Sequence, residues 1–104
     1  PVVISTGGGI ILEPENRSFI KNTGYCVWLT ADADTILKRL GHDLDNVDAR
    51  PALTSDDIET ETRDLLVQRM PLYQTTAHFI IDTVTHTPDQ IADQIFRRFE
   101  HVRE

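Results

Sequence analysis

Three short, continuously apolar runs, separated by long segments, limit what this chain can fold into. The runs are Val2–Ile4, Tyr25–Thr30 and Phe79–Ile81. Because they do not alternate with polar residues, they are typical of strands that are covered on both faces. The connections between them are too long for hairpins, which favours parallel strands joined by right-handed crossovers. The sequence therefore predicts an α/β fold, a three-layer arrangement with a parallel sheet in the middle.

The connections between these runs contain helix start and stop residues and apolar residues at helical spacing. Pro14 can begin a short helix that Gly24 ends. Asp32 is a candidate N-cap for a second helix, which we expect to stop at Gly41. No periodicity is present from Gly41 to Asp57, where acidic residues surround the lone cation Arg50. We interpret that segment as a loop long enough to act as a lid.

Two further helices are predicted in the second half of the chain. One begins near Ile58, is supported by Glu59 and Arg63 four residues apart, and is kinked or broken at Pro71. The other follows the run Thr87-Pro-Asp-Gln90, in which a threonine and a glutamine three residues later are typical of a capping box.

Composition and charge exclude several classes of function. The chain has 104 residues, the length of one domain, and a net charge of −7, which argues against general binding to nucleic acid or to an anionic membrane. No apolar run approaches the roughly 18 residues of a membrane span, and we expect a cytoplasmic protein. Cys26 is the single cysteine, and the histidine spacings match no zinc motif, so we expect no metal site on this chain.

Three consecutive glycines, Gly7, Gly8 and Gly9, directly follow the first apolar run. Backbone without Cβ atoms can turn sharply and present N–H groups to an oxyanion, and open α/β sheets bind ligands at the carboxyl ends of their strands. The alternative is a tight turn between a strand and a helix, with no ligand.

Three arginines are candidates for binding an anion, and each also has a plainer interpretation. Arg50 precedes Pro51 and could extend over a phosphate, or it could simply pair with Asp48 in solvent. Arg69 could enter a cleft and bind a carboxylate with its planar fork of donors, or it could be an exposed helical residue. Arg39 lies in the last expected turn of its helix, where a cation is favourable without any ligand.

Five short motifs, taken in order along the chain, resemble those of the shikimate kinase family. They are Ile4-Ser-Thr-Gly-Gly-Gly9, Asn16-Arg17, Arg50-Pro-Ala-Leu53, Arg69-Met-Pro-Leu-Tyr73 and Ile81-Asp-Thr83. Each match is short, and the specificity lies in their common order from about Val2 to Phe99.

The resemblance implies a P-loop kinase fold and an enzyme that moves the γ-phosphoryl group of ATP to the 3-hydroxyl of shikimate, with Mg²⁺, in aromatic amino-acid biosynthesis. It implies that Gly7–Gly9 line the shikimate site and that Arg69 holds the shikimate carboxylate. Arg50 would be the catalytic lid arginine that reaches the ATP phosphates. Arg39 and Pro88 would enclose the adenine.

The family's phosphate-binding motif is absent from this sequence. No G-x-x-x-x-G-K-[ST] occurs in it, and the family's catalytic aspartate and the Mg²⁺ ligands also have no counterpart here. Ala52 departs from the leucine that the family usually has. We therefore interpret residues 1–104 as the C-terminal part of a single shikimate kinase-like domain, inert by itself because phosphoryl transfer depends on positioning and electrostatic stabilisation.

The family's strand order, 2-3-1-4-5, implies that the strands present are the third, fourth and fifth. The sheet would then be incomplete and have unpaired edges. We therefore expect one of three outcomes: the sheet rearranges, the fragment pairs with another copy through those edges, or an N-terminal part was cleaved or is disordered.

Two other functions remain open at this stage. One is a non-catalytic kinase-like module that serves regulation or assembly, which a P-loop upstream of Pro1 would exclude. The other is a different small-molecule kinase, such as a gluconate kinase, which substrate comparison would distinguish.

Overall fold

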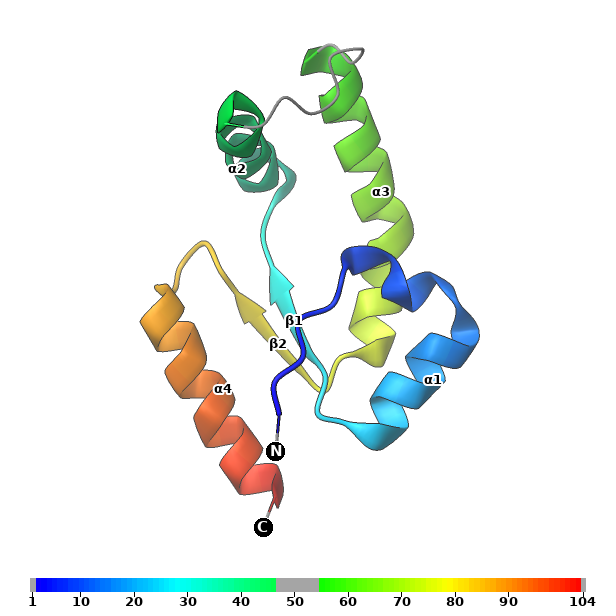
Figure 1. The fold of residues 1–104 in the computed structure, drawn as a ribbon, viewed down its shortest axis with the longest axis vertical. Helices are drawn as coiled ribbons and strands as arrows, with labels where there is room; N and C mark the ends of the chain where they lie inside the picture. Colours follow the sequence, from blue (N-terminus) through cyan, green and yellow to red (C-terminus); the bar gives the residue numbers. More distant parts are fainter. Residues whose placement is uncertain (1, 47–54, 104) are drawn as a thin grey trace.

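The computed structural model describes residues 2–46 and 55–103, which form a mixed α/β fold (Figure 1). In that view α4 lies to one side of the two strands, and α1 and α3 lie to the other. The elements are a 3₁₀ helix η1 (Gly8–Leu12), α1 (Pro14–Thr23), β1 (Val27–Thr30), α2 (Ala33–Asn46), α3 (Ser55–Thr76), β2 (Phe79–Asp82) and α4 (Pro88–Arg103).

The sheet of the described residues consists of β1 and β2, which pair in parallel. Val27 pairs with Phe79 and Thr30 with Asp82, and the long crossover between the strands contains α2 and α3. Ile81, in the middle of β2, is 3% exposed and belongs to the core. The predicted parallel pairing of the second and third apolar runs is therefore confirmed, and the small parallel sheet is consistent with the expected α/β class.

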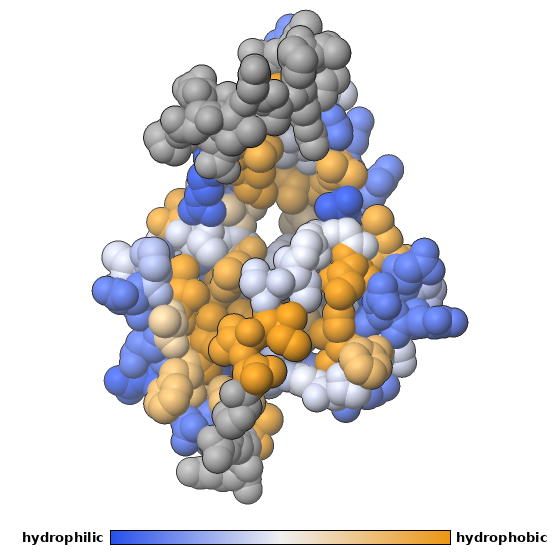
Figure 2. Space-filling view, in the orientation of Figure 1, coloured by the Kyte–Doolittle hydropathy of each residue, from blue (hydrophilic) through white to orange (hydrophobic). Residues whose placement is uncertain are grey.

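The first apolar run does not form the expected strand. Val2, Val3 and Ile4 lie outside any strand and are 83%, 100% and 75% exposed. A strand needs a neighbour for its N–H and C=O groups, and apolar composition alone does not supply one. Figure 2 shows apolar surface in the middle of the face that this N-terminal segment crosses. The self-association expected from unpaired strand edges stays a prediction.

Two predicted helix starts are confirmed in atomic detail. At the start of α2, the Thr35 amide donates a 2.7 Å hydrogen bond to Oδ1 of Asp32, the predicted N-cap. At the start of α4, the Thr87 amide donates to Oε1 of Gln90 at 2.8 Å, and the Gln90 amide donates to Oγ1 of Thr87 at 3.2 Å. This reciprocal pair is the predicted capping box.

The predicted helix stop at Gly41 is wrong, because α2 continues to Asn46. A glycine within a helix costs only about 0.8–1 kcal/mol relative to alanine, so it weakens a helix without ending it. The loop predicted from Gly41 to Asp57 is correspondingly too long, since α3 already begins at Ser55. The middle of that predicted loop lies outside the described residues.

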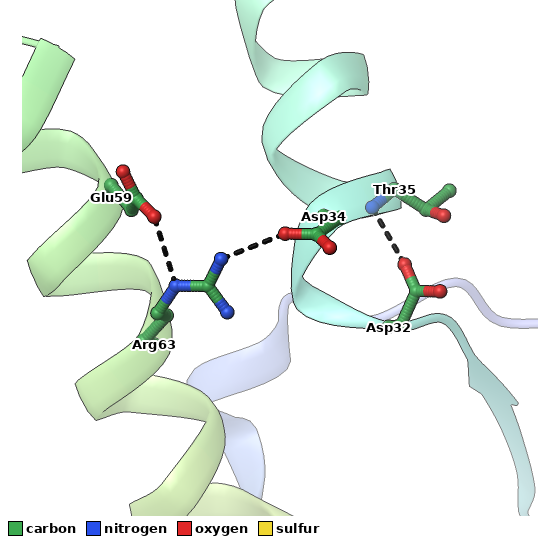
Figure 3. Close-up of polar contacts among 5 residues, drawn as sticks. All are labelled: Asp32, Asp34, Thr35, Glu59 and Arg63. Carbon is green, nitrogen blue, oxygen red and sulfur yellow. Dashed lines mark hydrogen bonds and ion pairs between the residues drawn. The ribbon is translucent and has the colours of Figure 1, made fainter.

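The helix α3 continues past Pro71 to Thr76. One of its arginines joins it to α2. Arg63 donates through Nε to Glu59 at 3.1 Å, the predicted pair one turn apart, and through Nη2 to Asp34 of α2 at 2.7 Å (Figure 3). These charges lie at the surface, so they orient the two helices and contribute little to stability. None of the described helices has the length and apolar character that crossing a membrane requires.

Candidate active site

The fold brings the glycine triplet and Arg69 together, although about sixty residues separate them in the sequence. A Cβ atom built on Gly8 would lie 3.2 Å from Nη1 of Arg69, and one built on Gly9 would lie 3.6 Å from Nη2. The glycines come from the start of η1, and Arg69 comes from the second-last turn of α3. The guanidinium therefore lies directly against the glycine backbone.

The absence of a side chain at Gly8 permits a close approach by Tyr73 and Arg69, and it does not serve an unusual backbone angle. None of Gly7, Gly8 and Gly9 has a φ in the left-handed region. A Cβ on Gly8 would lie 2.7 Å from Oη of Tyr73, whereas one on Gly7 would meet nothing within 4 Å. The sharp glycine turn expected from the sequence is thus an extended residue, Gly7, followed by a 3₁₀ turn.

Tyr73 is part of this site, and the sequence reasoning did not assign it a role. Its hydroxyl donates a 2.8 Å hydrogen bond to the carbonyl oxygen of Gly8. Its ring packs against Trp28 of β1, with 5.4 Å between the ring centroids. Tyr73 follows Arg69 by four residues, so both side chains lie on one face of α3. This four-residue spacing is the sequence feature that could have identified Tyr73 as part of the site.

Arg69 carries a donor that lacks an acceptor. Its Nε atom is buried and has no hydrogen-bond partner among the residues that the structure describes. A buried unpaired donor is unfavourable, and a bound group that accepts its hydrogen is one explanation for it. The fork of N–H groups on a guanidinium matches the two oxygens of a carboxylate.

Arg17 holds the segment that carries the glycines. Its Nη1 atom, from α1, donates to the carbonyl oxygens of Ile11 and Leu12 at 2.6 and 3.2 Å. These carbonyls lie at the end of η1, where the helix leaves them unpaired. Arg17 belongs to a motif that the resemblance contains, and its role here is to fix η1 onto α1.

Arg39 lies at the carboxyl ends of the two strands. Its Nη1 atom donates to Oγ1 of Thr83 at 3.1 Å, and that hydroxyl donates to the Thr30 carbonyl at 2.8 Å. Thr83 directly follows β2, in the connection that leads to Pro88, the first residue of α4. The structure thus connects Arg39 to Thr83, five residues before Pro88. That Arg39 and Pro88 enclose a nucleotide stays a prediction.

The remaining predicted site residue, Arg50, lies outside the described residues. Among the side chains that the structure describes, no three His, Cys, Asp or Glu residues are arranged to hold a metal ion. Burial raises the pKa of the Cys26 thiol above its ordinary value of 9.0, with Lys21 acting in the opposite direction. A raised pKa favours the protonated thiol at neutral pH.

A shallow hollow on α4 is separate from these groups. It is lined by Gln94, Arg97, Arg98 and His101. None of the predicted site residues lines it. Arg98 packs over the ring of Phe79, with its guanidinium carbon 4.8 Å from the ring centroid, and Arg97 pairs with Asp93 at 2.9 Å. Its arginines thus already have partners, and we place the candidate site at the glycines and Arg69.

Comparison with known proteins gives one consistent result. The family model described as "Shikimate kinase" matches residues 1–100. The chain is 39% identical to a shikimate kinase of Rhodopirellula baltica over 91% of its own length and 51% of that relative. It is 36% identical to a shikimate kinase of Syntrophus aciditrophicus over 97% of its length and 56% of that relative. With a shikimate kinase 2 of Salmonella heidelberg the identity is 42%, over 89% of this chain and 50% of the relative. The chain spans about half the length of the curated relatives it matches.

Proposed function

Because this chain belongs to the shikimate kinase family, we propose that the protein containing it transfers the γ-phosphoryl group of ATP to the 3-hydroxyl of shikimate. The observation that carries this proposal is the approach of Arg69 to the backbone of Gly8 and Gly9. A cation with a buried, unpaired Nε beside an exposed backbone suits a small acid with several hydroxyl groups.

In this proposal Arg69 binds and orients the acceptor. Its guanidinium takes the carboxylate, and the glycine backbone lies against the carbocyclic ring, where side chains would prevent close contact. Holding the acceptor in one orientation lowers the barrier because the reaction then needs little further loss of rotational and translational freedom.

The nucleotide is assigned to the carboxyl ends of the strands. Arg39, held by Thr83, lies where the two strands end, and Pro88 begins the helix that follows. A planar guanidinium together with a proline ring can enclose an aromatic base. ATP supplies the phosphoryl group. We assign no Mg²⁺ ligand to the described residues, because they contain no suitable cluster of carboxylates.

We also propose that residues 1–104 alone do not turn over ATP. The chain contains no G-x-x-x-x-G-K-[ST], and without the amides and lysine of that motif the phosphates are not positioned. ATP hydrolysis or phosphate transfer by the isolated chain would contradict this.

The test of the acceptor compares shikimate with gluconate as substrates of the full-length protein, measured by ADP formation. We expect turnover with shikimate and at most weak turnover with gluconate. Arg69→Ala should raise the KM for shikimate about 10- to 100-fold, the loss expected for a charged hydrogen-bonding pair. Arg97→Ala, which removes an exposed arginine on α4, is the matched control and should leave the KM near the parental value. Equal use of gluconate, or an unchanged KM in Arg69→Ala, would overturn the assignment.

A further inference from the structure

Tyr73 connects three parts of the molecule that are distant in sequence. It lies on α3, its hydroxyl donates a 2.8 Å hydrogen bond to the Gly8 carbonyl, and its ring packs on Trp28 of β1. The ring centroids of Tyr73 and Trp28 are 5.4 Å apart at an interplanar angle of 38°. The packing of the ring on the strand fixes the position of the hydroxyl.

The preceding turn of α3 presents Arg69 to the same glycine. Cβ positions on Gly8 would be 2.7 Å from the tyrosine hydroxyl and 3.2 Å from Nη1 of Arg69. Gly8 thus lies between the two side chains. The Tyr73 hydroxyl already has Gly8 as a partner, whereas Nε of Arg69 has none among the described residues. One side chain is engaged with the loop, and the other retains an unpaired donor.

Because the peptide unit is planar, the hydrogen bond from Tyr73 to the Gly8 carbonyl also constrains the Gly9 amide. The Gly8 carbonyl and the Gly9 N–H belong to one trans peptide unit and point in opposite directions. When Tyr73 holds the carbonyl, the direction of the Gly9 amide is fixed as well. Glycines otherwise have the widest choice of backbone conformations, so three in succession need such an external constraint.

We propose that Tyr73 is a positioning residue of the acceptor site, which holds the Gly8–Gly9 peptide at a fixed distance from the Arg69 guanidinium. This rests on the proposed function, in which a carboxylate-bearing acceptor binds against both groups. In this proposal Tyr73 does not touch the acceptor. It sets the orientation of the glycine backbone and its position relative to the guanidinium that takes the carboxylate.

The test uses Tyr73→Phe in the full-length protein, because this change removes the hydroxyl and retains the ring that packs on Trp28. The matched control is Tyr25→Phe. Tyr25 is the other tyrosine of the chain, and its ring contacts His78 and Phe99. Two measurements are made on each variant: the chemical shifts and hydrogen exchange of the Gly8 and Gly9 amides without substrate, and the separate values of kcat, KM for shikimate and KM for ATP.

We expect the two glycine amides to shift and to exchange faster in Tyr73→Phe and not in Tyr25→Phe. The KM for shikimate should rise up to about tenfold, the loss expected for one hydrogen bond, while the KM for ATP stays unchanged. A purely structural role would instead lower the melting temperature and change both KM values.

Unchanged glycine amides in Tyr73→Phe would overturn the proposal, whatever the substrate. Shifted amides with an unchanged KM for shikimate would also overturn it, since Tyr73 would then order the loop without affecting the acceptor. A parent protein that does not phosphorylate shikimate overturns the proposed function, and with it the acceptor part of this inference. The amide comparison then still decides whether Tyr73 fixes the loop.

Discussion

The guanidinium of Arg39 and the hydroxyl of Thr83 lie 3.1 Å apart, where the carboxyl ends of β1 and β2 meet. Thr83 accepts this hydrogen bond while its own hydroxyl donates to the Thr30 carbonyl at 2.8 Å. The Thr83 amide donates to the same carbonyl, also at 2.8 Å. The backbone therefore stays anchored without the side chain, and the hydroxyl specifically orients Arg39.

Replacing Thr83 by valine should weaken nucleotide binding and leave acceptor binding unchanged. Valine has the same shape but cannot accept the hydrogen bond, so Arg39 loses its fixed orientation. Steady-state kinetics on the full-length protein should show a KM for ATP raised about three- to tenfold, as expected for one lost hydrogen bond. Thr83→Ser retains the hydroxyl and serves as the control. A valine variant with the parental KM for ATP would contradict the assigned role of Arg39.

Adding a side chain should lower the free energy of unfolding at Gly8 but not at Gly7. A Cβ on Gly8 would overlap the Tyr73 hydroxyl, whereas Gly7 has open space and ordinary backbone angles. Gly8→Ala should lower the free energy of unfolding by about 1–3 kcal/mol. Gly7→Ala should leave it unchanged or raise it by up to about 1 kcal/mol, because alanine restricts the unfolded chain. Urea denaturation measures both, and equal destabilisation by the two changes would contradict the close approach at Gly8.

Local features of this fold were predictable from the sequence, because neighbouring residues determine them. Asp32 caps α2 through the amide of a residue three positions later, and Thr87 and Gln90 cap α4 across the same interval. Such bonds form within one turn of the chain, so the residue types and their spacing suffice to predict them.

Contacts between distant segments were not predictable from residue types alone. The bond from Tyr73 to Gly8 spans 65 residues, and the bond from Lys21 to the Thr75 carbonyl spans 54. The exposed run Val2–Ile4 has the composition of a buried strand but no partner strand among the described residues. Arg69 was a carboxylate-binding candidate from its donor geometry and from the family resemblance, whereas its approach to Gly8 came only from the fold.

The capping box at the start of α4 should contribute measurably to stability. Thr87→Ala removes the acceptor for the Gln90 amide and should lower the free energy of unfolding by about 1 kcal/mol. Gln94→Ala, one turn further along α4, leaves the cap intact and is the control. Because each residue of the box bonds to the other, Thr87→Ala and Gln90→Ala should show a non-additive effect in a double-mutant cycle. Additive losses would contradict the reciprocal pairing.

The Asp32 cap of α2 should make the free energy of unfolding fall at acid pH. Hydrogen bonds from the side chain and the amide of Thr35 lower the pKa of Asp32 below its ordinary value of 3.8, with smaller contributions from Lys38 and Arg39. A carboxylate with a lowered pKa in the folded state stabilises that state above the pKa of the unfolded chain. This stabilisation is fully present at neutral pH and is lost as the pH falls through 3.8 and then through the lower folded value.

Asp32→Asn removes the charge of residue 32 and keeps the capping hydrogen bond, because asparagine can accept the Thr35 hydrogen bond but does not titrate in this range. The difference in unfolding free energy between parent and Asp32→Asn should therefore be greatest near neutral pH and shrink toward pH 3. Asp32→Ala, which removes the cap itself, should remain less stable than Asp32→Asn at every pH. Urea denaturation at a series of pH values measures these differences. A parent and an Asp32→Asn variant with parallel pH profiles would show that the Asp32 charge does not contribute to the stability of this helix start.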